Sequence, residues 1–290
     1  MMNLQPTEGR PPADPMQDGP FMKLHDLGKE LNAQRSNETE LCDISFKLGK
    51  EIVWAHQSVL FTRSPYIDNL LLHKELKKIE VEIQGLNAKA FSEVIQFFYT
   101  SEMCINRHNV EEILPVACFL QVADVKKHCE SILKQSMNIH NVSRIWRLAS
   151  QLKCEELIAH AFKYATANFI RLAQANEFVQ LDLKQLADVI SHPGFFIEVE
   201  QDLYTSVMKW VTYDVTTREV HLKELLDCVR FPLLGLQFVE KTVENDDLIQ
   251  KSHVLTKIVQ ESKADMKLFE SQLKPNSSLV FTGLLNNCLN

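Results

Sequence analysis

His56 is the side chain whose chemistry has to be decided first, because an imidazole can act as a base or bind a metal. It closes the segment CDISFKLGKEIVWAH, which carries Asp43 near its start. A catalytic base needs a nucleophile and an orienting group within hydrogen-bonding reach. The chain has none of the GxSxG, HExxH, Walker or GxGxxG patterns that would supply them. A histidine that helps to hold a fold together is therefore the favoured interpretation.

The remaining chemical groups do not form a recognisable site either. The paired carboxylates Glu111-Glu112 and Glu155-Glu156 are adjacent, so on a helix they point about 100° apart and do not converge. There are seven cysteines and no CxxC pair. The candidate zinc ligands, in a spacing that matches no compact zinc pattern, are Cys104, His108, Cys118, His128 and Cys129. We expect no enzyme, no metal and no cofactor, and reduced core cysteines in a cytoplasmic or also nuclear protein.

Composition narrows the class of partner. The 290 residues are 45% hydrophobic and 24% charged, the mix of a globular protein, and are enough for two domains. The net charge of −7 argues against a nucleic-acid partner, since such domains usually carry a basic face. No run reaches the roughly 18 apolar residues of a membrane helix, so we expect no membrane partner. Residues 1–20 are rich in proline and polar residues, which predicts a disordered tail.

Apolar periodicity predicts both strands and helices in the first half. Alternation over 44–48 and 52–54, with Gly49-Lys50 between them, predicts a hairpin, and 79–83 predicts a third strand. Asn87 can cap a following helix whose apolar face is formed by Phe91, Val94, Ile95 and Phe98. A further helix is predicted around Pro115, which should kink it or start it. Before the hairpin, an approximate helical stripe is formed by Phe21, Leu24, Leu27 and Leu31.

From about residue 138 the pattern is helical, with Trp146 and Trp210 expected on buried helix faces. Phe169, Phe178 and Leu181 are expected in the same core, with a turn at Leu181-Asp182. The fold class predicted is α+β: a small sheet with helices, followed by an all-α domain, with the boundary near residues 136–142.

Several segments resemble a known family. LNAQRSNETELCDISF, AHQSVLFTRSPYI and VIQFFYTSEMCINRHNVEEILPVACFLQV resemble, in order and spacing, the BTB (POZ) domain. NFIRLAQANEFVQLDLKQLADVIS, VEQDLYTSVMKWVTYD and HLKELLDCVRFPLL resemble the BACK domain of kelch-like proteins. We expect a BTB domain over 21–135 and a BACK domain over 136–265. Residues 266–290, which include KPNSSLVFTGLLNNCLN, resemble the start of a first kelch blade, and the propeller that would follow is absent from this sequence.

The resemblance implies partners and roles. It implies a homodimer or heterodimer through the BTB domain, in which the N-terminal helix buries the stripe of Phe21, Leu24, Leu27 and Leu31. It implies that Asp43 and His56 are buried polar residues of the BTB core. It also implies a substrate adaptor for cullin-3 ubiquitin ligases, which does no chemistry and acts by raising effective concentration.

The sequence departs from the family at two partner-related positions. Relatives usually have Arg or Lys after the Ala-His pair, where this chain has Gln57, so a charged pocket with Asp43 is in doubt. Cullin-3 adaptors commonly carry an apolar-x-Glu motif where this chain has Leu76-Lys77-Lys78. The predicted cullin contact is therefore degenerate, and it comprises Leu76, Lys77, Lys78 and Tyr99.

Two functions follow from the resemblance. The first is a cullin-3 adaptor that recruits a protein substrate, whose identity the sequence does not give. The second is a non-ligase scaffold or regulatory dimer that pairs with full-length kelch-like relatives and sequesters them. A BTB transcription regulator would need zinc fingers or a basic region, and the sequence has neither.

Overall fold

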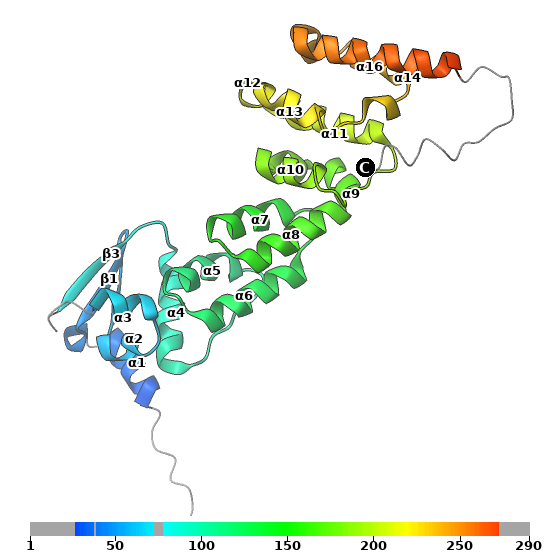
Figure 1. Cartoon of the computed structure of the whole chain (residues 1–290). Helices are drawn as coiled ribbons and strands as arrows, with labels where there is room; N and C mark the ends of the chain where they lie inside the picture. The colour runs from blue at the N-terminus through cyan, green and yellow to red at the C-terminus, as the bar shows by residue number, and fades with distance from the viewer. Residues whose placement is uncertain (1–26, 38, 72–77, 273–290) are drawn as a thin grey trace, which may run out of the picture. The chain divides into compact units, whose positions relative to one another are not determined.

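Figure 1 shows the computed structural model of the chain, which describes residues 27–37, 39–71 and 78–272. The chain divides into two compact units. The first runs to Cys104 and includes Phe119–Val122, and the second comprises Ile105–Cys118 and the chain from Ala123 onward. The first unit contains a sheet and the second is helical, so the predicted α+β class is confirmed. Several residues named above lie outside the described residues: Phe21, Leu24, Leu76, Lys77 and the stretch from 273 to 290.

The sheet of the first unit has three strands in the order β2-β1-β3. The hairpin is confirmed: β1 (Ile44–Leu48) pairs antiparallel with β2 (Glu51–Ala55) across a turn in which Gly49 has φ of +62°. That left-handed conformation favours glycine, which has no Cβ to clash. β3 (Ile79–Ile83) then pairs with β1 in parallel, and the register sets Ile44 opposite Ile79. The fully buried Ile44 and Phe46 therefore share one face with the apolar residues of β3.

Helices cover this sheet. In chain order they are α1 (Leu27–Asn37), η1 (Thr39–Leu41), α2 (Gln57–Phe61), α3 (Pro65–Leu71) and α4 (Ala88–Thr100). The cap of α4 is confirmed, since the Asn87 side-chain oxygen accepts the N–H of Ala90 at 3.0 Å. Its predicted apolar face is buried, and the Phe46 and Phe91 rings pack 5.1 Å apart. α4 contacts α1, α2 and β2, so it is the central helix of this unit.

The second unit is a succession of helices that follow one another in space in chain order (Figure 1). Its longer helices are α5 (Val110–Phe119), α6 (Ala123–Ser136), α7 (Val142–Gln151), α8 (Glu155–Ala167), α10 (Leu183–Ile190), α11 (Glu200–Tyr213) and α16 (His253–Gln272). Shorter ones are α9 (Phe169–Gln174), η2 (Asn176–Gln180), α12 (Val215–Arg218), η3 (Glu219–His221), α13 (Leu222–Leu226), η4 (Phe231–Leu233), α14 (Leu236–Phe238), η5 (Val239–Val243) and α15 (Asp247–Lys251). Most of α5 and all of α6 group with this unit. The boundary predicted from the sequence between the mixed and the helical domain lay later, near residues 136–142.

Aromatic side chains form the core of the second unit, as predicted. Trp146 on α7 and Trp210 on α11 are both buried, and the Trp210 indole N–H donates to the carbonyl oxygen of Leu181 at 2.9 Å. The turn at Leu181-Asp182 is present because Asp182 caps α10 in a reciprocal capping box with Gln185. Pro115 lies inside α5 rather than at its start, so that alternative was wrong.

Candidate protein-interaction surfaces

Asp43 and Gln57 form a polar link where β2 passes into α2. The carboxylate of Asp43 accepts the backbone N–H of Gln57 at 2.7 Å, and the Gln57 amide donates to the Asp43 carbonyl oxygen at 2.9 Å. The N–H of the first residue of a helix has no partner within the helix, so the carboxylate satisfies it. Gln57 is buried, with 3% exposure. Asp43 is half-buried, whereas the family resemblance implied that it would be buried. The neutral amide makes this link through hydrogen bonds alone.

His56 is held by Tyr99. The Tyr99 hydroxyl accepts the backbone N–H of His56 at 2.8 Å and lies 3.0 Å from its Nδ1. The Tyr99 hydroxyl and Nδ1 are hydrogen-bonded, and which of them donates depends on the tautomer of His56. Burial raises the pKa of Tyr99 to about 12, although its bond to His56 and the charge of Arg35 act in the opposite direction. His56 itself is half-buried, less enclosed than expected, because it lies at the rim where β2 ends.

Cys42 and His56 are a neighbouring cysteine–histidine pair, an arrangement that can support nucleophilic catalysis. Cys42 Sγ lies 4.0 Å from His56 Nε2. Burial is the main cause of a raised pKa for the Cys42 thiol, so the nucleophilic thiolate is disfavoured. The side chain is also almost fully enclosed, which leaves no room for a substrate. The geometry therefore favours a structural role for both residues.

Arg35 is the residue of this region that sequence reasoning missed. Its side chain is only 8% exposed, with Nε donating to Asn32 at 2.8 Å and Nη1 to the Trp54 carbonyl oxygen at 3.3 Å. The guanidinium lies 5.4 Å from the centre of the Tyr99 ring, and burial lowers its pKa. The available signal was spacing: Arg35 follows Leu31 by four residues, on the same helical stripe.

Of the predicted cullin contact, Lys78 and Tyr99 lie within the described residues. Lys78 is exposed, and its Nζ lies 5.1 Å from the centre of the Trp54 ring across the sheet. Tyr99 is 6% exposed and its hydroxyl is bonded to His56, so the side chain is largely enclosed in this chain, and its part in a cullin contact stays a prediction. The reason is that α4 is covered on several sides, by α1, α2 and β2, and therefore buries more than one face.

Exposed apolar side chains of the first unit lie on neighbouring elements. Leu27 is 66% exposed on α1, and Leu41 on η1 and Ile52 on β2 are also exposed. α1 contacts both η1 and β2. Leu31, which belongs to the predicted stripe, is half-buried. These three exposed residues are named the apolar surface of the first unit below.

Neither a metal site nor a membrane helix is found in the part of the chain that the structure describes. No three His, Cys, Asp or Glu side chains there are grouped closely enough to hold a metal ion. No described helix is both long and apolar enough to cross a bilayer. The described cysteines are free thiols: Cys42, Cys104, Cys118, Cys129, Cys154 and Cys228.

Comparison with known proteins agrees with this architecture. The model of the BTB/POZ domain matches residues 31–137, and that of BACK (BTB And C-terminal Kelch) matches residues 142–244. Among solved structures, the BTB domain of zebrafish PATZ1 is 29% identical and has a TM-score of 0.35, with 38% of this chain and 91% of that chain covered. The two domain matches follow each other along the chain in the order that the sequence predicted. The protein belongs to the BTB–BACK family.

Proposed function

We propose that this BTB–BACK protein is a non-catalytic adaptor that dimerises through its first unit and presents a bound protein to a cullin-3 ubiquitin ligase. An adaptor of this kind raises the effective concentration of a substrate near the enzyme. The apolar surface of the first unit is the observation that supports the proposal, because exposed large apolar groups on adjoining elements mark sites of protein association. The enclosure of Cys42 and the raised pKa of its thiol support a structural role for the Cys42–His56 pair.

Dimerisation is tested by measuring the mass of the purified chain with light scattering. A dimer is expected, and Leu27→Asp should shift it toward monomer because a charge would be buried at the contact. Val220→Asp is the matched control, since Val220 is an exposed apolar residue of the second unit. A monomeric wild-type chain, or a Leu27→Asp variant that stays dimeric, would remove the apolar surface from the proposal.

Ligase recruitment is tested by calorimetric titration with the cullin-3 N-terminal domain. Saturable heat with submicromolar affinity, on the order of −8 kcal/mol or better, is the expected result. Lys78→Glu, which places a carboxylate at the third position of the Leu76-Lys77-Lys78 triplet, should strengthen binding. Lys50→Glu is the control, because Lys50 is an exposed lysine at the hairpin turn. No heat at concentrations of about tens of micromolar would contradict the ligase role.

The second candidate is a scaffold or regulatory dimer without a ligase, which pairs with kelch-like relatives and sequesters them. It is supported by Lys78, which stands where an adaptor carries glutamate and lies over the Trp54 ring. A mixed dimer would present one substrate arm instead of two. Dimerisation without cullin-3 binding, together with subunit exchange between this chain and a full-length relative, would favour it over the adaptor.

A further inference from the structure

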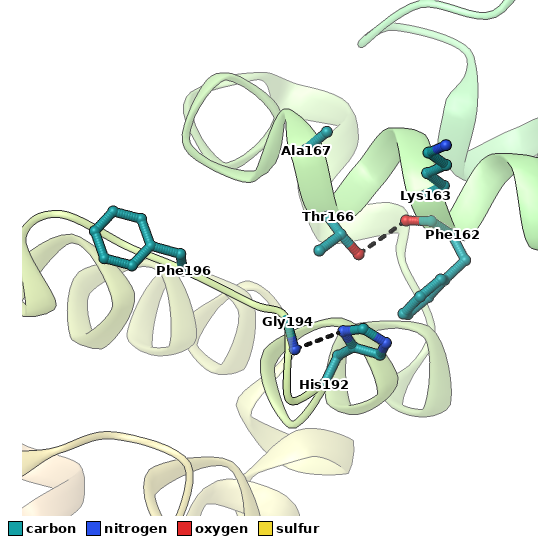
Figure 2. A pocket seen from close by; sticks show the side chains of 7 residues that line it. All are labelled: Phe162, Lys163, Thr166, Ala167, His192, Gly194 and Phe196. Carbon is teal, nitrogen blue, oxygen red and sulfur yellow. Dashed lines mark hydrogen bonds between the residues drawn. The ribbon is translucent and has the colours of Figure 1, made fainter. Parts of the chain in front are cut away.

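A groove in the second unit lies between α8 and the segment that joins α10 to α11. It has a volume of about 550 Å³ and is lined by Phe162, Lys163, Thr166, Ala167, His192, Gly194 and Phe196 (Figure 2). It lies within the BACK domain and involves none of the residues discussed for dimerisation or for cullin-3. A volume of this size is in the range of ligand sites in proteins.

The joining segment holds a fixed conformation around His192. The Gly194 backbone N–H donates to His192 Nδ1 at 3.0 Å, and the imidazole packs edge-on against the Phe162 ring at 5.0 Å (Figure 2). A Cβ at position 194 would lie 3.1 Å from His192 Cε1, so glycine allows the ring to sit close to the backbone. Because Nδ1 accepts a hydrogen bond, the neutral ring carries its proton on Nε2. In Figure 2 this second nitrogen lies on the Phe162 side of the ring.

The same segment fixes Phe196 in an outward position. Its two neighbours point inward: Phe195 packs edge-on against Phe169 at 5.0 Å, and Ile197 is buried. Alternation along an extended stretch then directs Phe196 to the surface, where 82% of it is exposed. Figure 2 shows its ring on the far side of the groove from Phe162. Holding a large aromatic side chain in water is unfavourable, so a partner that covers it gains apolar burial.

The charges around the groove indicate what it would bind. Lys163 is exposed on α8, and no carboxylate is among the lining residues. The lining thus combines a cation with the apolar walls of Phe162, Ala167 and Phe196. A carboxylate complements Lys163, and an apolar side chain complements the walls. Most of the lining is exposed, which suits an extended chain better than a small molecule that must be largely enclosed.

We propose that this groove binds an extended peptide segment of a partner protein in which an aromatic or aliphatic side chain is flanked by carboxylates. The apolar side chain lies between Phe162 and Phe196, and a carboxylate pairs with Lys163. The site gives the BACK domain a surface for selecting acidic, partly apolar partners, and it operates whether or not the chain recruits cullin-3.

Fluorescence anisotropy with the full chain tests the proposal. The probe is a rhodamine-labelled peptide with a Glu-Phe-Glu centre and glycine flanks, compared with matched peptides centred on Gln-Phe-Gln and Glu-Ala-Glu. We expect saturable binding of the first peptide with a Kd of about 0.1–1 mM, and at least about tenfold weaker binding of the other two. Higher salt should weaken the binding, because Lys163 is exposed and its pairing is screened.

Surface variants locate the binding. Phe196→Ser and Lys163→Glu should each weaken the affinity by about tenfold or more, and both positions are exposed, so the fold is retained. Val220→Ser and Lys184→Glu, at exposed positions elsewhere in the unit, should leave it unchanged. Absence of saturable binding up to about 10 mM peptide, or equal binding by the two groove variants and the wild type, would overturn the proposal. Equal binding of the Gln-Phe-Gln peptide would refute the role of charge.

Discussion

Replacing Tyr99 with phenylalanine isolates the polar contact that fixes the end of β2. The variant keeps the ring that Arg35 approaches and removes the hydroxyl that accepts the His56 N–H at 2.8 Å and lies 3.0 Å from Nδ1. Loss of a partner for a partly buried donor costs about 1–3 kcal/mol. At neutral pH the variant should therefore unfold with a free energy about 1–2 kcal/mol below that of the wild type.

The pKa of Tyr99 gives this difference a pH dependence. The pKa is raised from 10.0 to about 12 by burial, so folding disfavours the phenolate. Below about pH 10 the hydroxyl is neutral in both states, and the wild type keeps the full benefit of the bond. As the pH rises from about 10 to 12 the unfolded chain ionises first, and stability is lost. With these two pKa values, the free energy of unfolding of the wild type should fall by close to RT ln 10, or about 1.4 kcal/mol, between neutral pH and about pH 11.

Urea denaturation followed by circular dichroism at about pH 7.5 and pH 11 measures both effects. At about pH 7.5 the wild type should be more stable than Tyr99→Phe. At about pH 11 most of this difference in stability should disappear. Tyr204 and the buried thiols are shared by both proteins, so their own titration cancels in the comparison. Tyr213→Phe is the matched control, since Tyr213 is 67% exposed and should show neither change.

Two results would refute the reasoning. If Tyr99→Phe is as stable as the wild type at neutral pH, the bond to His56 contributes nothing to stability. If the difference between the two proteins is the same at both pH values, the hydroxyl is not shielded from water in the folded chain. The second result would also favour the predicted place of Tyr99 at a partner surface.

Three further predictions concern other parts of the chain. Asn87→Ala should lower the free energy of unfolding by about 1 kcal/mol, measured by urea denaturation, because the Ala90 N–H loses its cap; no change would mean that water replaces it. Glu200→Gln should cost about 1.5–3 kcal/mol, since the buried carboxylate accepts the Arg230 N–H at 2.6 Å and its guanidinium at 2.7 Å, and a fully stable variant would contradict this. In iodoacetamide labelling followed by mass spectrometry, exposed Cys104 should react well before Cys129, whose pKa burial raises to about 12; the reverse order would show that the site of Cys129 opens readily.

Local sequence patterns were sufficient to predict most of the secondary structure. The hairpin follows from alternation on either side of Gly49, and the start of α4 follows from Asn87, because both features depend on residues close together in the chain. The helical second unit and the buried faces with Trp146 and Trp210 follow from the same periodicity. The family resemblance gave the order of the two domains.

Packing between distant segments decided what periodicity could not. Tyr99 follows Phe98 directly, and one apolar face cannot bury both, yet both are buried because α4 is covered by α1, α2 and β2. Arg35 lies in the last turn of α1, and only the fold brings it to the Trp54 carbonyl oxygen.

The groove depends on tertiary structure in the same way. Phe162 and His192 are thirty residues apart in sequence, and their contact requires α8 and the segment after α10 to pack together. The apolar character of Phe196 is visible in the sequence, but its exposure is set by the inward packing of its two neighbours. The sequence by itself therefore determined which segments are helix and strand and which family they form. The tertiary structure decided which side chains face a partner, because exposure depends on residues far away in the chain.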